Sequence, residues 1–378
     1  MAAVRPAIPV RPIDTPLPML PDYAGACIAN VVAAIRSPAP PAWVPVHVAG
    51  ADQVVLLVLD GLGWDQLQDR TAVAPTLAAM SGGPITSVAP TTTAVALTSI
   101  TTGLPPAAHE VVGYRVRVEG DQVLNVLRWR TGLGDARDRV SPTEFQRQPV
   151  FGGVPTAVVT KSAFAATGFT LAHLAGVRLH GWGVPSSLPV EVGRLVQAGE
   201  RFVYAYYDGI DHVAHGSGFG ANYDAELRAA DRLVADVMEV LRPGAVLVVT
   251  ADHGQVEVGD ASLLLPIDIV NDTVLVSGEG RFRWLHARPG GRDRLQAAAT
   301  DAFGHVAWVH NVDEIEAAGW FGGALTDAGR SRLGDVAIIP HADVAVTDPR
   351  DTGELALRCR HGSVTRAEML VPLLAARG

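Results

Sequence analysis

The sequence predicts an α/β fold with a mainly parallel central sheet and a smaller inserted α+β lobe. Three short segments are almost purely apolar, as strands buried on both faces are: 54–59, 202–206 and 245–249. Segments with apolar residues at helical spacing alternate with them, notably 188–198 and 223–241. This alternation is typical of a parallel sheet that carries helices on both faces.

The other elements follow in chain order. Apolar spacing and turn residues predict helices over 23–36, over 64–80 with a break near Pro75, and from the threonines at 91–93 to Thr102. Strands are expected over 85–88 and 155–160, with a hairpin within 116–127. The end of the chain, 361–374, is expected to form a loop and then a helix.

The domain organisation is expected to be simple. Six prolines among the first 21 residues predict an extended N-terminal arm over 1–22, followed by a single domain over 23–378. Four short strands and a helix over 292–303 predict that the smaller lobe occupies about 265–355.

Composition excludes some classes of partner. The chain has 378 residues, is 48% hydrophobic and carries a net charge of −9 without a lysine/arginine cluster, so we expect no nucleic-acid polymer as partner. It has no uninterrupted apolar run long enough to span a membrane. The chain has two cysteines, Cys27 and Cys359, which are far apart in the sequence and favour a reducing, cytoplasmic location. A disulfide between them is the alternative. The sequence predicts no particular oligomeric state.

Acidic and imidazole groups follow three of the predicted strands. They are Asp60, then Asp208 and His212, then Asp252 and His253, and His361 is a further candidate near the end of the chain. Taken singly, each acid could be a helix cap or a turn residue. Because the carboxyl ends of parallel strands share one sheet edge, these side chains should lie close together. Burying them together without an opposite charge is unfavourable in free energy. Since aspartate and histidine are ligands of zinc-like ions, the set predicts a metal site.

Three threonines open the predicted helix after Pro90. The N-terminus of a helix presents free N–H groups and a partial positive charge, which favour an anionic phosphoryl oxygen. A threonine hydroxyl can act as a nucleophile once metal coordination lowers its pKa. At least two of the three threonines are expected to serve only as caps or turn residues.

The order of these motifs resembles the alkaline phosphatase superfamily, most closely its nucleotide pyrophosphatase/phosphodiesterase branch. The matching stretches span residues 58 to 373 and are VLDGLG, PTTTAVALTSITTGLPPAAHEVVGY, DGIDHVAHGSG, TADHG and HGSVTRAEMLVPL. The resemblance implies an alkaline-phosphatase-like three-layer sandwich and a hydrolase of phosphate esters. It implies a small-molecule phosphate ester or nucleotide as substrate and a phosphothreonine intermediate.

The resemblance also implies roles for individual residues. Thr93 falls on the position of the nucleophile. Two divalent ions are implied, zinc first, with manganese or magnesium as alternatives. The implied ligands of one ion are Asp60, Asp252, His253 and Thr93; those of the other are Asp208, His212 and His361.

The chain departs from the branch at one position. Tyr114 stands where the branch carries an asparagine that binds a phosphate oxygen, which weakens the case for diesters. His215 is expected to contact a ligand or the substrate, and Lys161 to be a surface lysine. A phosphomonoesterase or a phosphonate hydrolase on the same site is the alternative activity. A non-catalytic, metal-stabilised binding protein is the alternative outside enzymes.

Overall fold

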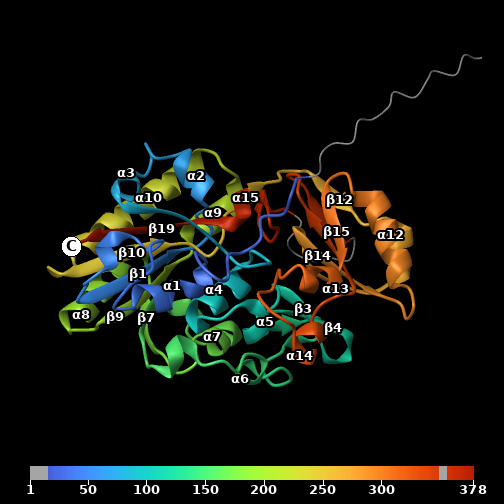
Figure 1. The fold of residues 1–378 in the computed structure, drawn as a ribbon, viewed down its shortest axis with the longest axis horizontal. Coiled ribbons are helices and arrows are strands. Elements are labelled where there is room, and N and C mark those ends of the chain that lie inside the picture. The colour runs from blue at the N-terminus through green and yellow to red at the C-terminus, as the bar shows by residue number, and fades with distance from the viewer. Residues whose placement is uncertain (1–15, 349–355) are drawn as a thin grey trace, which may run out of the picture.

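The computed structural model describes residues 16–348 and 356–378 (Figure 1). Most of the expected arm over 1–22 therefore lies outside the described residues, as does the end of the expected lobe at 349–355. The described residues 16–21 belong to no helix or strand.

A seven-stranded sheet forms the centre of the molecule, with the strand order β2-β19-β10-β1-β9-β7-β8. Its strands are β1 (Gln53–Leu59), β2 (Ser81–Thr86), β7 (Ala157–Lys161), β8 (Arg178–Trp182), β9 (Phe202–Tyr207), β10 (Ala245–Thr250) and β19 (Leu370–Arg377). β1 is parallel to both β9 and β10, and β7 is parallel to β8 and β9. The predicted mainly parallel sheet is confirmed.

The end of the chain differs from the prediction. The expected terminal helix is a single short turn, α15 (Arg366–Met369), and the apolar residues after it form β19. β19 runs antiparallel between β10 and β2. A short apolar run fits a buried strand or a buried helix equally well. Here the run forms a strand because it lies between the edges of β10 and β2 and pairs with both.

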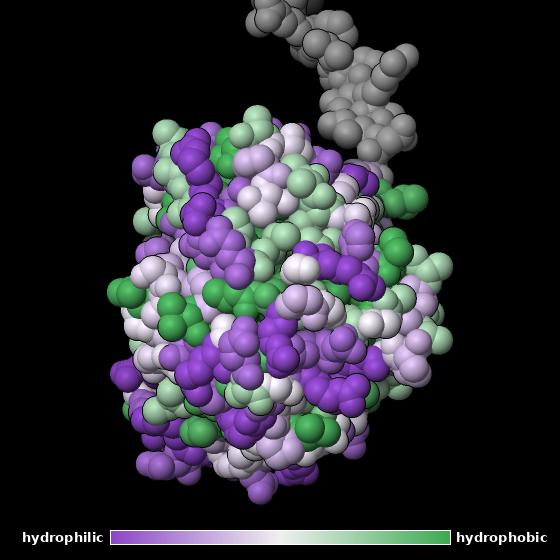
Figure 2. Space-filling view, turned by 90° about the vertical axis from the view of Figure 1, so that its left-hand side faces the viewer, coloured by the Kyte–Doolittle hydropathy of each residue, from purple (hydrophilic) through white to green (hydrophobic). Residues whose placement is uncertain are grey.

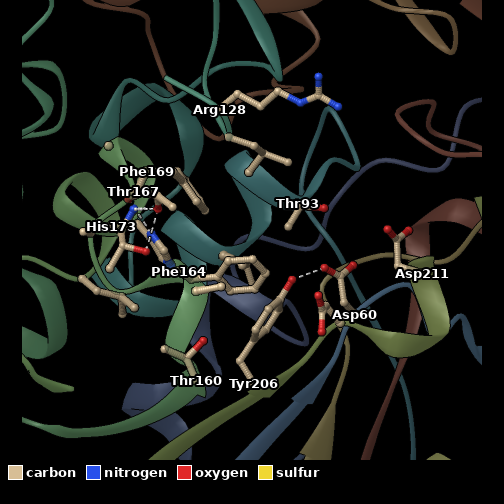
Figure 3. Close-up of a pocket in the computed structure, with 18 of the residues that line it drawn as sticks. Asp60, Thr93, Arg128, Thr160, Phe164, Thr167, Phe169, His173, Tyr206 and Asp211 are labelled. Atoms are coloured by element: carbon tan, nitrogen blue, oxygen red, sulfur yellow. Dashed lines mark hydrogen bonds between the residues drawn. The ribbon is translucent and has the colours of Figure 1, made fainter. Parts of the chain in front are cut away.

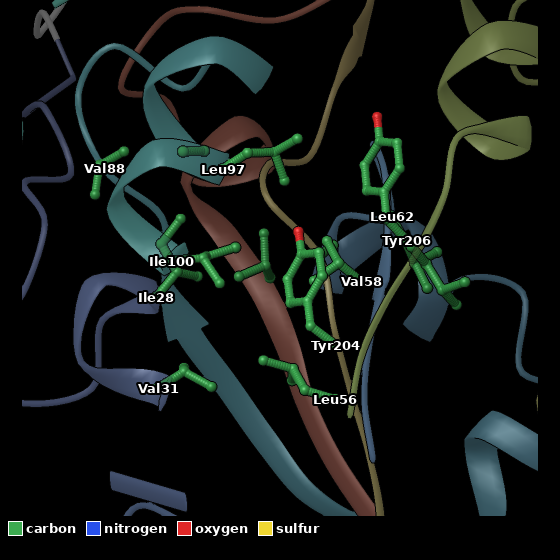
Figure 4. Close-up of a cluster of buried hydrophobic side chains, with 14 of the residues drawn as sticks. Ile28, Val31, Leu56, Val58, Leu62, Val88, Leu97, Ile100, Tyr204 and Tyr206 are labelled. Carbon is green, nitrogen blue, oxygen red and sulfur yellow. The ribbon is translucent and has the colours of Figure 1, made fainter. Parts of the chain in front are cut away.

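Helices cover both faces of the sheet (Figure 1). On one face, α1 (Ile28–Ile35) and α4 (Thr93–Thr102) lie against each other, and Figure 4 shows Ile28 and Ile100 in the same apolar core as Leu56 of β1 and Tyr204 of β9. The other face carries α8 (Leu188–Gln197) and α10 (Ala221–Glu239). The three-layer arrangement agrees with the expected sandwich.

A second, antiparallel sheet stands beside the first. It consists of β13 (Thr273–Glu279), β14 (Phe282–Ala287), β16 (Val336–Pro340) and β15 (Ala307–Asn311), in this spatial order. With α12 (Arg292–Phe303) it encloses its own apolar cluster, which includes Leu285, Leu295 and Ile338. The strands and the helix expected within 265–355 are therefore present in the structure.

The remaining elements are short. The helices are α2 (Trp64–Gln68), α3 (Pro75–Ala79), α5 (Pro106–His109), α6 (Pro142–Phe145), α7 (Gly168–His173), α9 (Gly209–Ser217), α11 (Ile267–Asp272), α13 (Val312–Ala317) and α14 (Asp327–Ser331). The strands are β3 (Arg115–Val118), β4 (Gln122–Asn125), β5 (Arg130–Thr131), β6 (Gly134–Asp135), β11 (Val256–Glu257), β12 (Ser262–Leu264), β17 (Ala345–Thr347) and β18 (Cys359–Arg360). β3 and β4 form the expected hairpin.

The surface and the cysteines complete the description. Hydrophilic residues cover much of the face shown in Figure 2, and hydrophobic ones are scattered over it singly or in small groups. Within the described ranges, no helix has the length and apolarity needed to cross a membrane. Cys27 and Cys359 are both buried, free thiols, so the disulfide that the sequence left open does not form.

A buried ion pair joins the second sheet to the end of the chain. Arg281, in the turn between β13 and β14, donates to Glu368 of α15 over 3.1 Å (Nε to Oε1) and 2.6 Å (Nη2 to Oε2), and both side chains are fully buried. Arg281 also donates to Val344 O, and Glu368 accepts from Ser363 N and Thr365 Oγ1. Because the pair is satisfied on both sides, removing one partner leaves the other charge buried and uncompensated.

We expect Glu368→Ala to lower the free energy of unfolding by about 3–5 kcal/mol, since Arg281 would keep its buried charge. Urea denaturation followed by circular dichroism measures this. The matched control is Arg366→Ala, which breaks the exposed pair with Asp65 and should cost less than about 1 kcal/mol. Equal costs for the two variants would contradict the structural role of the buried pair.

Candidate active site

The carboxyl ends of β1 and β10 deliver the first acidic groups. Asp60 follows β1, and the next residue, Gly61, has a φ of +74°. A Cβ at Gly61 would lie 2.9 Å from the Asp211 Cβ atom, so only glycine lets α9 approach this turn. The Gly61 N–H donates to Asp252 Oδ1 over 3.1 Å, which ties the two strand ends together.

Asp60, Asp252 and His253 form the first cluster, as expected from the sequence. One ligand atom from each lies within 4.8 Å of the others, and all three residues are buried. The Nε2 atom of His253 is 3.5 Å from Asp60 Oδ1 and 3.4 Å from Asp252 Oδ2. Thr93 Oγ1 lies 3.1 Å from the same nitrogen, so the predicted nucleophile stands beside this cluster.

The second cluster differs from the expectation. His361 gathers with Asp211 and His215, whose Nε2 atom is 3.3 Å from Asp211 Oδ1; the Nε2 atom of His361 is 3.8 Å from that oxygen. The stretch DGIDHVAH contains two overlapping pairs of an aspartate and a histidine four residues apart. A shift of three residues turns the pair by roughly 60° around the helix axis, and α9 presents the second pair to His361.

Asp208 and His212, the expected ligands, lie outside this cluster. Asp208 Oδ2 accepts a hydrogen bond from Lys161 Nζ over 2.9 Å, so its charge is already compensated by a lysine that is only partly exposed. His212 is exposed at the mouth of the site. The spacing in the sequence could not separate the two overlapping pairs, and we therefore replace Asp208 and His212 by Asp211 and His215 as candidate ligands.

Backbone carbonyls orient the three histidines. The Nδ1 atoms of His215, His253 and His361 lie 2.7, 3.1 and 2.8 Å from the carbonyl oxygens of Cys359, Gly254 and Thr91, respectively. A carbonyl oxygen can only accept, so each Nδ1 carries the proton and each Nε2 has a lone pair that is available to a metal. His253 and His361 stack with ring centroids 3.6 Å apart, which places the two clusters side by side.

The two clusters consist of acceptors without matching donors. Asp60 Oδ1, Asp211 Oδ1 and Asp252 Oδ2 are buried and have no hydrogen-bond partner among the described residues. The second oxygen of Asp60 accepts from the hydroxyl of Tyr206 (Figure 3), and Asp252 Oδ1 accepts from the N–H groups of Gly61 and His253. Converging carboxylates and neutral imidazoles are costly alone and are the usual donor set for a divalent cation. The residues present therefore fit two metal ions.

Burial is the main cause of the pKa shifts of these groups. It raises the pKa of Asp60, and the charges of Asp252 and Asp211 raise this pKa further. Burial likewise raises the pKa of Asp211 and of Asp252. It lowers the pKa of His253, and it lowers the pKa of His361 well below the ordinary value, assisted by the neighbouring histidines. A bound cation would reverse this preference and stabilise the charged acids.

Two further side chains border the site. Tyr114 lines a cavity of about 460 Å³ together with Thr93 and His361, and its hydroxyl accepts from Asn125 Nδ2 over 2.7 Å. Arg128 lies above Thr93 in Figure 3 and lines the same cavity. Sequence reasoning missed Asn125 and Arg128, because no motif marks them and only the hairpin brings them to the site.

The fold is that of the alkaline phosphatase superfamily. The chain matches the family model of type I phosphodiesterase/nucleotide pyrophosphatase over residues 54–364 and belongs to that family, whose members are metal-dependent hydrolases of phosphate esters. A comparison with curated proteins found no match.

Solved structures show the same fold. An inactive threonine-to-alanine variant of murine ectonucleotide pyrophosphatase/phosphodiesterase 5, in complex with AMP, has a TM-score of 0.66 and 14% identity, with 86% of this chain and 88% of that chain covered. Phosphonoacetate hydrolase from Sinorhizobium meliloti, in complex with phosphonoformate, has a TM-score of 0.64 and 18% identity, with 87% and 91% covered.

Because the pKa of Asp60 is raised, we expect Asp60→Asn to increase the stability of chelator-treated protein, and we expect this increase to grow with pH. Above the ordinary pKa of 3.8 the unfolded acid loses its proton while the folded acid keeps it, so wild-type stability falls relative to the variant as pH rises. Above the raised folded pKa the variant should be more stable by about 1–3 kcal/mol. Thermal unfolding between pH 4 and pH 8 measures the difference, and the exposed Asp138→Asn is the control. A difference that does not grow with pH would contradict the buried charge.

Metal content tests the choice between the two overlapping pairs on α9. We expect Asp211→Asn to lose about one of two bound ions per chain and Asp208→Asn to retain both, because only Asp211 has a free buried oxygen facing His361. Elemental analysis after reloading with zinc and gel filtration provides the count. Loss of an ion from Asp208→Asn alone would restore the pair that the sequence suggested.

Proposed function

We propose that the protein hydrolyses small phosphodiesters or nucleotide pyrophosphates through a nucleophilic attack by Thr93. The observation that carries the proposal is the position of the Thr93 hydroxyl, at the first turn of α4 and 3.1 Å from His253 Nε2 in the first acceptor cluster. No other threonine of the motif is placed in this way. The Thr91 hydroxyl donates to Ser363 O over 2.6 Å and is thereby committed to the backbone.

The start of α4 is held against the segment that carries His361. Thr91 N donates to Gly362 O over 3.1 Å, and Gly362 N donates to Thr91 Oγ1 over 3.0 Å. Thr92, the N-cap of α4, makes no side-chain cap, so the first N–H groups of the helix stay available to an anion. This favours a phosphoryl oxygen at the N-terminus of α4, beside the Thr93 hydroxyl.

The candidate ligands divide into two sets. Asp60, Asp252 and His253, with Thr93, would hold one ion; Asp211, His215 and His361 would hold the other. Zinc suits this mixture of carboxylate and imidazole donors, with manganese and magnesium as alternatives. When bound, such ions lower the pKa of a coordinated hydroxyl and neutralise charge on phosphoryl and leaving oxygens.

The chain itself supplies the nucleophile and the alignment. Thr93 Oγ loses its proton to solvent and attacks phosphorus opposite the leaving oxygen; the bond to that oxygen breaks, the leaving oxygen takes up a proton, and the phosphoryl group is carried on Thr93. Water then attacks phosphorus and gives up a proton, the Thr93–phosphorus bond breaks, and Thr93 Oγ takes up a proton to restore the hydroxyl. The N-terminus of α4 stabilises the charge of the phosphoryl oxygens throughout.

The comparisons support this proposal and also define its alternative. The murine neighbour is inactive with alanine in place of a threonine and binds AMP, in agreement with a threonine nucleophile and a nucleotide-like substrate. The phosphonoacetate hydrolase neighbour supports a phosphonate hydrolase, and Arg128 above Thr93 offers a cation for a second anionic group in that reaction or in that of a phosphomonoesterase. The cytoplasmic location stays a prediction from the sequence.

Thr93→Ala should lower the turnover of bis(4-nitrophenyl) phosphate by at least about 1,000-fold, because it removes the hydroxyl beside the first cluster. Thr93→Ser, which keeps a hydroxyl, should retain far more of the activity. Release of 4-nitrophenolate by protein reloaded with zinc, manganese or magnesium provides the measurement, with 4-nitrophenyl phosphate as the monoester comparison. Unchanged turnover in a Thr93→Ala protein with full metal content would exclude Thr93 as the nucleophile.

A further inference from the structure

Residues 16–23 connect the second sheet with the part of the molecule that carries the candidate site (Figure 1). At the start of this segment, Trp308 Nε1 of β15 donates to Pro16 O over 2.8 Å. Further along, Met19 N donates over 2.9 Å to Val364 O, which lies between β18 and α15. The chain then enters α1, which lies against α4. The segment therefore contacts the second sheet and also the neighbourhood of both candidate clusters.

The hydroxyl group of Tyr23 makes the central contact of this segment. It donates to the carbonyl oxygen of Trp320, in the loop after α13, over 2.9 Å, because a carbonyl oxygen can only accept. The same hydroxyl oxygen accepts from the N–H of Ala89 over 3.4 Å. Burial raises the pKa of Tyr23 well above its ordinary value, so the hydroxyl keeps its proton near pH 7. One side chain thus links the loop after α13 to the loop that leads into α4.

The N–H of Ala89 depends on this contact. Ala89 is fully buried, and within the described ranges the Tyr23 oxygen is the only acceptor of its N–H. A buried N–H without a partner is unfavourable, so the loop would shift if the hydroxyl were removed. Ala89 precedes Thr93 by four residues, and Thr92 N donates to Pro90 O over 2.9 Å between them. Because this turn is closed by a hydrogen bond, a shift at Ala89 moves Thr93 as well.

The loop after α13 also holds the far end of α4. Phe321 O of that loop accepts from Ala107 N, shortly after α4, over 3.0 Å. Gly322 has a φ of +75°, and a Cβ atom there would lie 2.5 Å from Pro105 Cβ and 2.9 Å from Tyr23 Cδ2. Only glycine therefore lets the loop approach both residues. The loop thus holds α4 at both ends, through Tyr23 at the start and directly at the end.

We propose that Tyr23 is a positioning residue for Thr93: its hydroxyl fixes the loop before α4 against the loop after α13, and thereby fixes Thr93 Oγ1 beside the first cluster. The inference rests on the proposed function, in which Thr93 attacks phosphorus. Tyr23 is not among the described residues that line the cavities at Thr93, so it acts through the backbone. Misplacing a reacting group by about 1 Å can lower a rate by about 100-fold.

Tyr23→Phe keeps the ring and removes only the hydroxyl. In zinc-reloaded protein we expect kcat for bis(4-nitrophenyl) phosphate to fall about tenfold, with KM within about twofold and metal content unchanged. The matched control is Thr273→Val, which removes a buried hydroxyl that donates to Ile269 O over 2.6 Å beside the second sheet. Its kcat should stay within about twofold of wild type. Equal falls in both variants, a change in KM alone, or loss of metal from Tyr23→Phe would overturn the assignment.

Binding of orthovanadate and of inorganic phosphate tests the position of Thr93 without turnover. Orthovanadate accepts a fifth oxygen ligand and so resembles the geometry of the displacement, whereas phosphate does not. In calorimetric titrations of zinc-reloaded protein, we expect Tyr23→Phe to lower the ratio of vanadate affinity to phosphate affinity by about tenfold. Thr273→Val should leave the ratio unchanged. Within one variant the ratio does not depend on the fraction of folded protein, and an unchanged ratio in Tyr23→Phe would overturn the assignment.

Amide hydrogen exchange separates this assignment from the proposed function. Peptides that cover 87–97 should exchange at least about threefold faster in Tyr23→Phe than in wild type, and Thr273→Val should leave their exchange unchanged. Faster exchange, together with full turnover by Thr93→Ala, would support the link from Tyr23 to α4 and overturn the proposed function. Unchanged exchange and kcat in Tyr23→Phe, together with an inactive Thr93→Ala, would overturn the assignment and leave the proposed function standing.

Discussion

The structure depends on one electrostatic constraint: three aspartates and three histidines meet at the carboxyl edge of the central sheet. Their facing atoms are acceptors, and three carboxylate oxygens have no hydrogen-bond partner among the described residues. In a low-dielectric interior such a group of like charges is unfavourable unless cations or protons compensate it. The fold therefore holds together a set of residues whose charges a bound cation would compensate.

Several contacts outside the clusters keep this arrangement in register. The mutual hydrogen bonds of Thr91 and Gly362 fix the start of α4 to the His361 segment. The same segment is anchored by Glu368, whose partner Arg281 comes from the second sheet. Through this ion pair the second sheet holds the His361 segment in place, although none of the six candidate ligands belongs to that sheet. The candidate nucleophile and the candidate ligands take their positions from five separate parts of the chain.

Two cavities meet at Thr93, and both are bordered by Arg128. One also includes Tyr114 and Arg360. The other extends past Phe164 to His173 and includes Arg130 and Arg137. Each cavity therefore places cationic side chains around the position proposed for the phosphoryl group.

The sequence alone determined the parts that depend on local pattern. Uninterrupted apolar runs determined the parallel strands, and the residues that follow them placed Asp60, Asp252 and His253 at one sheet edge, because strand ends share an edge whatever the details of packing. Their association with Thr93 was implied by the family resemblance. Tertiary structure decided the rest. It selected Asp211 and His215 over Asp208 and His212, since both pairs have helical spacing and only the rotation of α9 against His361 separates them. It also made a strand of residues 370–377, which lie between β10 and β2, and it formed the cavity between Thr93 and His173 from segments that no local pattern connects.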